Sequence, residues 1–370
     1  MKLKEPFILS DFTSGVLDDI SVSDSLLPKN AVRKGINVIF DRPRGSISQR
    51  YGTTRLGDDN VSLGNTITGL HNFRSSNSSL SKMLASASTA IFYLNGTTWT
   101  STVSNLTTNL KTRFLTYLDT VVFMNGTDAS QSWTGSSSWI TSGGNLDVGS
   151  FPLTKFATIL NTRVLATGNS SSPDTVYESS LESGGTISWT SGNRSFKVFP
   201  NDGNGGISGI TGNGRLALIF KERGFYRYDG DQLLRVVNIG TPSHESIVND
   251  DNGTTYFFGT GSNGVGFYRT DGGYPKKISR GITKYVEAIS PSFYSNICGF
   301  TNGTKVCWSV GSVTVDSTTY SNTWLCFNIA DESWEIRNYA ESFRVFSSYI
   351  NSSGNLTIVG GDTDGMVQTI

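Results

Sequence analysis

The stretch that decides the fold is Gly206–Gly240, which reads GISGITGNGRLALIFKERGFYRYDGDQLLRVVNIG. It holds four short runs rich in β-branched, aromatic and long aliphatic residues, which favour extended strands. Glycine and an Asp-Gly pair between the runs supply the positive φ angles that tight hairpins need. Four antiparallel strands of this size form one blade of a β-propeller. The predicted strands are Ile207–Ile210, Arg215–Phe220, Phe225–Tyr228 and Leu233–Asn238.

The same order of strand, turn, apolar strand, turn, aromatic strand, turn and polar strand recurs on both sides of this stretch. The units are about 30 to 50 residues long, which brackets the usual blade period of roughly 40–50 residues. We therefore predict an all-β protein with a β-propeller of about seven four-stranded blades. Six blades are the nearest alternative, and two stacked sandwiches fit less well because no linker separates two halves. The other units cover residues 69–105, 113–142, 153–199, 245–282, 288–339 (with a strand at Phe293–Phe300) and 343–370.

The last unit is one strand short, and this shortfall predicts how the ring closes. An open ring would expose sheet edges that invite aggregation. Upstream of the first unit, Ile36–Gly57 reads as two strands, Asn37–Asp41 and Ser46–Thr54, which are free to complete the seventh blade. Residues 1–35 have few strand signals and read as an extended arm, which either packs on another molecule or wraps around its own domain. The predicted organisation is an N-terminal arm at 1–35 and a propeller domain at 36–370.

The composition excludes several classes of protein. Lys and Arg together number 30 and balance 30 Asp and Glu, so no global field holds nucleic acid or an anionic membrane. No stretch approaches the roughly 18 apolar residues of a membrane span, and we expect no membrane partner. Disorder is not indicated, because 21 Phe, 14 Tyr and 7 Trp supply large apolar surfaces.

Candidate interface residues gather near the N-terminus. On the arm, the aromatic side chains at Phe7 and Phe12 are candidate anchors. The stretch from residue 33 to residue 55 is dense in positive charge, and it faces an acidic partner or phosphates, or else it is a solvated strand face. The charged candidates are Arg33, Lys34, Arg42, Arg44, Arg50 and Arg55.

No motif predicts catalysis. The two histidines, His71 and His244, lie in different units and have no Cys, Asp or Glu at metal-ligand spacing. The chain has no Gly-x-Ser-x-Gly elbow, and its glycines are spread over turns. We therefore predict no catalytic, cofactor-binding or metal-binding residues, no cofactor and no enzymatic activity.

Cysteine and tryptophan leave further alternatives open. If Asn302 and Gly303 form a two-residue hairpin loop, Cys298 faces Cys307, and the pair forms either a bridge or two buried thiols. The third cysteine, Cys326, is most simply a core residue. The seven tryptophans pack between blades or, in a glycan-binding propeller, stack on sugars. Repeated Ser-x-Asp-x-Gly-x-x-Trp boxes, which sialidase-type propellers carry, are absent, and this disfavours a propeller glycosidase.

The pattern resembles the β-propeller tail proteins of tailed bacteriophages over residues 36–290. The resemblance spans four segments of the chain. These are Asn37-Val-Ile-Phe followed by Gly45-Ser-Ile-Ser-Gln-Arg50-Tyr-Gly52, Ile207-Ser-Gly-Ile followed by Arg215-Leu-Ala-Leu-Ile-Phe-Lys221 and Tyr226-Arg-Tyr-Asp-Gly230, Gly240-Thr-Pro-Ser-His-Glu-Ser-Ile247, and Gly264–Gly273.

This resemblance implies a structural virion component: a subunit of a homo-oligomeric ring, often of six, that forms part of a DNA channel. The implied partners are the portal, the adaptor and other tail proteins, with double-stranded DNA passing transiently. The implied location is the virion tail, assembled in the host bacterial cytoplasm. Because the chain is compact and has no large insertion between blades, it fits a short hub or stopper ring better than a long nozzle. A glycan-binding adhesion propeller is the alternative function.

Overall fold

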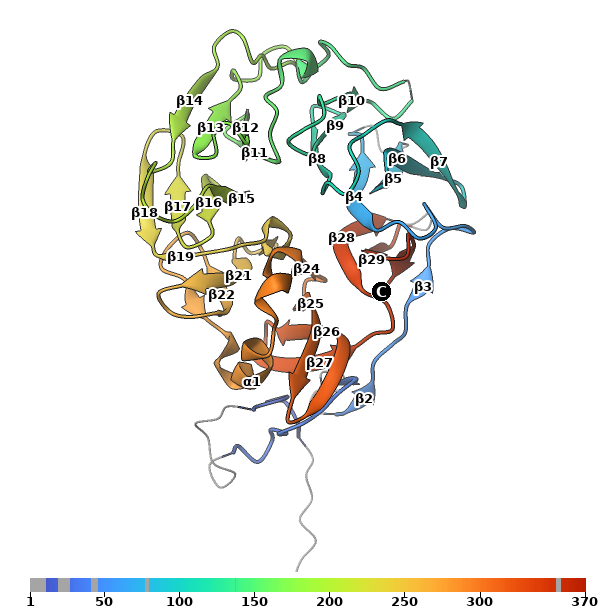
Figure 1. Ribbon diagram of the computed structural model, residues 1–370, viewed down its shortest axis with the longest axis vertical. Helices are drawn as coiled ribbons and strands as arrows, with labels where there is room; N and C mark the ends of the chain where they lie inside the picture. Colours follow the sequence, from blue (N-terminus) through green and yellow to red (C-terminus); the bar gives the residue numbers. More distant parts are fainter. Residues whose placement is uncertain (1–10, 19–26, 41–45, 77–79, 137, 351–353) are drawn as a thin grey trace, which may run out of the picture.

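The computed structural model describes residues 11–18, 27–40, 46–76, 80–136, 138–350 and 354–370. In this part of the chain, seven small antiparallel sheets are arranged radially around a central axis (Figure 1). The protein is therefore an all-β, seven-bladed propeller, and the predicted fold class and blade count are confirmed. A further two-stranded sheet, β1–β2, lies outside the ring.

The first four blades follow one another along the chain. Blade one contains β4 (Ile67–Arg74), β5 (Ser81–Ala87), β6 (Ala90–Asn95) and β7 (Thr98–Val103). Blade two contains β8 (Arg113–Tyr117), β9 (Thr120–Met124) and β10 (Ser132–Trp133). Blade three contains β11 (Phe156–Leu160), β12 (Arg163–Thr167), β13 (Thr175–Glu178) and β14 (Arg194–Lys197). Blade four contains β15 (Ile207–Asn213), β16 (Leu216–Lys221), β17 (Phe225–Tyr228) and β18 (Leu233–Val237).

The last three blades complete the ring. Blade five contains β19 (Ile239–Gly240), β20 (Val248–Asn249), β21 (Thr255–Gly261), β22 (Gly266–Thr270) and β23 (Lys276–Lys277). Blade six contains β24 (Cys298–Thr301), β25 (Lys305–Val315), β26 (Thr318–Asn328) and β27 (Ser333–Asn338). Blade seven contains β28 (Phe343–Ile350), β29 (Leu356–Asp362), β30 (Val367–Thr369) and β3 (Thr54–Arg55).

Short helical segments lie between the blades and within blade five. The helix α1 (Thr283–Glu287) lies between blades five and six. The described 3-10 turns are Val148–Ser150, His244–Ser246, Ser279–Ile282 and Pro291–Asn296. The predicted strand Phe293–Phe300 is wrong in its first half: Pro291 starts a 3-10 turn in which its fixed φ fits and its missing N–H is not needed, and the strand begins only at Cys298.

Blade four shows why its sequence forms a propeller. Every residue of β16 after Leu216 is buried, because both faces of the sheet are covered. Alternate side chains point to opposite faces. Ala217 and Ile219 belong to the hydrophobic cluster shared with blade three, whereas Leu218 and Phe220 pack against blade five. The apolar run is therefore the signature of a blade sandwiched between two others.

The N-terminal strands are shorter than predicted. Among the described residues of the segments Asn37–Asp41 and Ser46–Thr54, the structure forms β1 (Val38–Ile39) and β2 (Ser48–Gln49), which pair with each other, and Thr54 begins β3. In place of joining blade seven, β1 lies beside blade six, where the amide of Asn37 donates to the carbonyl of Ile336 at 2.9 Å. Thr54 and Arg55 form β3, which pairs antiparallel with β30.

Candidate functional site

The predicted interface residues that the structure describes follow the outside of blades five to seven. Phe12 is partly buried against the hydrophobic cluster of blades five and six. Exposed Lys34 lies 5.7 Å from the centroid of the Tyr320 ring, and its hydrogen bond with Tyr320 raises its pKa. Arg33 is partly buried, and Arg55 is exposed. Three predicted residues, Phe7, Arg42 and Arg44, lie outside the described residues.

Arg50 fastens the N-terminal segment to the propeller. Its guanidinium donates to the side-chain oxygen of Asn37 at 2.9 Å and to the carbonyl of Asn338 at 2.7 Å. It also stacks over the ring of Tyr339 at 4.1 Å. These contacts lie within the chain, so the contact of Arg50 with a partner stays a prediction.

An exposed apolar strip accompanies this segment, and sequence reasoning missed it. Tyr51 is 84% exposed and Leu356, at the start of β29, is 64% exposed. Both side chains line a cavity of about 450 Å³ between the N-terminal segment and blades six and seven. Ile47, 45% exposed, lies four residues before Tyr51. We call Tyr51 and Leu356, which share this cavity, the apolar strip.

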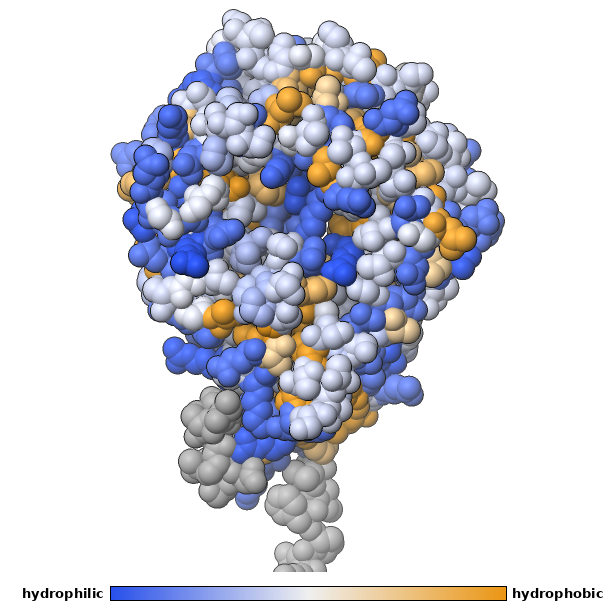
Figure 2. Space-filling model, in the orientation of Figure 1, coloured by the Kyte–Doolittle hydropathy of each residue, from blue (hydrophilic) through white to orange (hydrophobic). Residues whose placement is uncertain are grey.

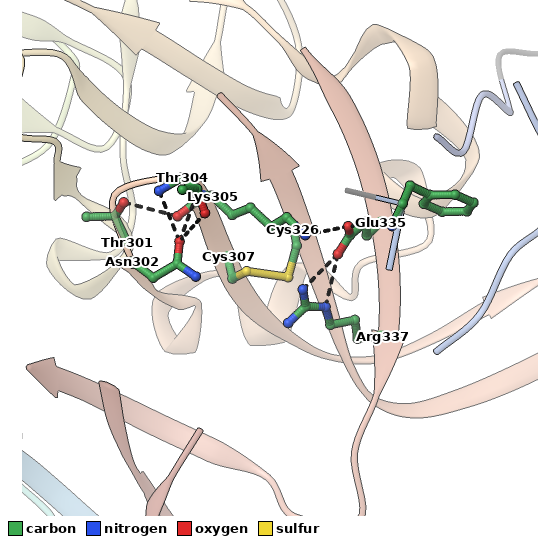
Figure 3. The surroundings of a disulfide bond; sticks show 9 residues. Thr301, Asn302, Thr304, Lys305, Cys307, Cys326, Glu335 and Arg337 are labelled. Atoms are coloured by element: carbon green, nitrogen blue, oxygen red, sulfur yellow. Dashed lines mark hydrogen bonds and ion pairs between the residues drawn. A yellow bond between two sulfur atoms is a disulfide. The ribbon is translucent and has the colours of Figure 1, made fainter. Parts of the chain in front are cut away.

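A disulfide and a buried ion cluster (Figure 3) contribute Lys305, Cys307 and Arg337 to the wall of this cavity. Glu335, only 1% exposed, pairs with Lys305 at 2.6 Å and with Arg337 at 2.7 Å. It also accepts the backbone N–H of Phe40 at 3.2 Å. Glu335 pairs with both cations and also accepts the Phe40 N–H. The cluster therefore anchors the N-terminal segment on blade six.

The disulfide joins Cys307 to Cys326 and corrects the predicted pairing. The side chain of Asn302 accepts the backbone N–H groups of Thr304 and Lys305, and the backbone N–H of Asn302 donates to the carbonyl of Lys305. The turn is therefore centred on Gly303 and Thr304, one residue later than the assumed turn at Asn302 and Gly303. The register shifts accordingly, and Cys298 faces Ser309. Cys307 instead faces Cys326 on β26, and Cys298 is a buried free thiol.

The middle of the ring holds a second ion cluster. The face seen in Figure 2 is hollowed there, and hydrophilic residues gather around the hollow. Glu245, in the 3-10 turn of blade five, pairs with Arg113 of blade two at 2.6 Å and with Lys111 at 3.0 Å. Lys111 also donates to the carbonyl of Ser295, at the entry to blade six, at 2.7 Å. Burial raises the pKa of Glu245, but the charges of Arg113 and Lys111 outweigh it and lower that pKa well below its usual range. We call Lys111, Arg113 and Glu245 the central knot.

The two histidines are neutral packing residues at neutral pH. Burial lowers the pKa of His71 to about 4, and its Nε2 lies 2.6 Å from the hydroxyl of Thr116. Burial, followed by the charge of Arg113, lowers the pKa of His244 to about 4 as well. The ring of His244 packs at a tilt against Phe156 of blade three, with the ring centroids 4.7 Å apart. Across the described residues, no three His, Cys, Asp or Glu side chains come together as a metal site requires.

The tryptophans pack inside the protein. Six of the seven are buried and the seventh, Trp139, is partly buried against Trp133. They therefore offer no exposed ring on which a sugar could stack. No helix within the described ranges is long and apolar enough to cross a membrane.

Comparison with known proteins supports the fold and no family. No family model matches the chain, and no curated protein matches it in sequence. The structure titled "YCF48 bound to D1 peptide" is similar at a TM-score of 0.51 and 9% identity, over 84% of this chain and 95% of that one. The extracellular domain of a putative one-component system, BT4673 from B. thetaiotaomicron, is similar at a TM-score of 0.52 and 10% identity, over 84% of this chain and 39% of that one. Similarity at this level shows a propeller and leaves function open.

Proposed function

We propose that the chain is a structural subunit of a phage tail, which assembles into a ring of the hub or stopper type below the portal and adaptor. The sequence resemblance motivates this proposal, and the apolar strip is the observation that carries it. Exposed apolar residues grouped at one cavity are typical of surfaces that bind another protein. Here Tyr51 and Leu356 share a cavity at the side of the ring-shaped domain, where a neighbouring subunit would bind.

In this role the propeller acts as a rigid wall. The balanced charge of 30 cationic and 30 acidic residues suits a surface past which double-stranded DNA slides without being retained. The N-terminal segment would carry the lateral contacts, with Arg50 and Glu335 holding it in place. The subunit would assemble in the host cytoplasm and remain in the virion.

We further propose that the N-terminal segment Ile36–Gly57 closes the ring of blades through β3. Support comes from the pairing of Thr54 with Thr369 and from the N–H of Leu56, which donates to the carbonyl of Val367 at 2.8 Å. The hydroxyl of Thr53 adds a bond to Gln368 at 2.6 Å. These contacts cover the edge that β30 would otherwise expose.

Native mass spectrometry of the purified protein, followed by cryo-electron microscopy of the virus particle, tests the tail role. We expect a closed ring in solution and density for this chain at the tail. Replacing both members of the apolar strip, in the double variant Y51S/L356S, should shift the ring toward monomer because it removes apolar contact area.

The matched control is L181S/L234S, which removes two leucines that are 54% and 42% exposed on blades three and four. We expect the control to assemble like the wild type. A chain that stays monomeric at high concentration and is absent from purified particles would rule out the tail role. Equal loss of assembly in both double variants would rule out the apolar strip as the contact.

A further inference from the structure

A cavity on blade five is lined by positive charge and has no role in the contacts described above. Its volume is about 700 Å³, and it lies beside β23 and the 3-10 turn Ser279–Ile282. Among the described residues that line it, three are cationic and none is acidic. The lining residues are Asn263, Tyr274, Pro275, Lys276, Lys277, Arg280 and Thr283.

Lys277 is held in place by the backbone around it. A Cβ added to Gly266 would lie 2.5 Å from Lys277 Cε, so the glycine leaves the space that the lysine stem occupies. The ammonium reaches Gly264, where an added Cβ would lie 3.9 Å from Nζ. Because the stem lies against Gly266 of β22 and Lys277 lines the cavity, much of the cost of ordering this side chain is met before any ligand arrives.

The charge of Lys277 is not matched by an acid in contact. Lys277 is half-buried, and burial lowers its pKa, while Glu287 opposes this only through longer-range attraction. In the part of the chain that the structure describes, neither Lys277 nor Arg280 forms an ion pair. Half-burying an ammonium without a partner costs free energy, and such groups concentrate at binding sites.

The rest of the lining adds donors. Lys276 lies 3.8 Å from Glu332, but that carboxylate also pairs with Arg269 at 2.6 Å, so it neutralises Lys276 only in part. The amide of Asn263 donates to the hydroxyl of Tyr274 at 2.9 Å and fixes its position. Ammonium, guanidinium and hydroxyl groups thus surround one cavity.

We propose that this cavity binds a phosphate group, with Lys277 and Arg280 as its main cationic contacts. A phosphate carries several acceptor oxygens and can engage ammonium, guanidinium and hydroxyl donors together, whereas a carboxylate has only two oxygens to offer. The volume leaves room for the molecule that carries the phosphate. The proposal does not rest on the tail role, so either one can fail alone.

Isothermal titration calorimetry with inorganic phosphate, and separately with a short DNA duplex, tests this site in the full chain at constant ionic strength. We compare the wild type with Lys277→Met, which keeps the stem in its slot and removes the charge. Lys197→Met is the matched control, because Lys197 is exposed on β14 of blade three, outside the cavity. Loss of a charged hydrogen bond should weaken binding by at least about tenfold in K277M.

Thermal melting separates a binding lysine from a structural one. Because K277M removes a half-buried charge that has no acid in contact, its Tm should equal or exceed that of the wild type. Saturable phosphate binding that K277M weakens and K197M keeps supports the site, with free phosphate as a sufficient ligand. The same pattern with duplex alone supports it, with the DNA backbone as the phosphate source. The absence of saturable binding to either probe, equal affinities in wild type and K277M, or a Tm lowered by K277M would overturn the proposal.

Discussion

Lys221 and Asp202 form a buried ion pair in blade four, and this pair stabilises the fold. Lys221 is fully buried, and its ammonium lies 3.1 Å from Asp202, 2.7 Å from Asp174 and 3.1 Å from the carbonyl of Phe199. Asp202 also accepts hydrogen bonds from Asn204 and from the hydroxyl of Tyr226. The lysine thus ends the apolar run of β16 without being left unpaired.

The first prediction concerns the pH dependence of stability. Burial raises the pKa of Asp202, but hydrogen bonds from Tyr226, Asn204 and Lys221 outweigh it and lower that pKa from 3.8 to about 2. Because the folded protein favours the ionised form, the stabilisation is fully present above the unfolded pKa and is lost as pH falls from 3.8 toward 2. The unfolding free energy, measured by urea denaturation over this interval, should therefore fall more steeply in the wild type than in D202N. Identical slopes in the two proteins would contradict this assignment.

At the residue scale, sequence reasoning found the turns more readily than the contacts. It identified Asn302 and Gly303 as a turn, but it could not tell that the Asn302 side chain accepts two backbone N–H groups and that the turn lies one residue later. That local difference moved the partner of Cys307 from Cys298 to Cys326. The pairing therefore depended on an interaction that residue types alone do not specify.

Strands and blades were easier to predict than single contacts, because each hairpin is local. The predicted third strand of blade four, Phe225–Tyr228, is β17 with the same bounds. The inner strands β19 and β20 of blade five were missed, because each is two residues long and carries no periodicity. The sequence carries no signal for the apolar strip either. Whether Tyr51 and Leu356 are exposed depends on how the N-terminal segment packs beside blades six and seven, which residue types alone do not specify.

The second prediction concerns β3, the element that we propose closes the ring. Replacing Leu56 with proline removes the N–H that donates to Val367, whereas Leu56→Ala keeps it and loses a comparable amount of packing. We expect amide hydrogen exchange of residues 367–369 to accelerate in L56P and to change much less in L56A. Deleting residues 36–57 should expose the β30 edge fully and cause aggregation, measured by light scattering. Unchanged exchange in L56P, together with a soluble deletion variant, would refute closure by β3.

At the scale of the whole molecule, contacts between residues far apart in the sequence link the blades. Arg113 and Glu245 are separated by 132 positions and belong to blades two and five, which are not neighbours. Arg113 also stacks over Phe156 of blade three at 4.5 Å. A repeat-by-repeat analysis of the sequence cannot find such a contact, because each blade is explained by its neighbours alone. In addition to the contacts between neighbouring blades, the central knot connects blades two and five directly across the middle of the ring.

The last prediction tests that connection. Replacing Glu245, which is 12% exposed, with alanine leaves Arg113 and Lys111 without their acid. Because these partners are 16% and 28% exposed, we expect a loss of about 2–3 kcal/mol of unfolding free energy, below that of a fully buried pair. The matched control is E332A: Glu332 pairs with Arg269 but is 52% exposed, and such surface pairs contribute about 0–1 kcal/mol. Urea denaturation followed by tryptophan fluorescence measures both. Because the knot joins blades that are not neighbours in the ring, E245A should also broaden the transition, as distant blades unfold less cooperatively. Equal losses in E245A and E332A, with equally sharp transitions, would mean that the blades are held by neighbour contacts alone.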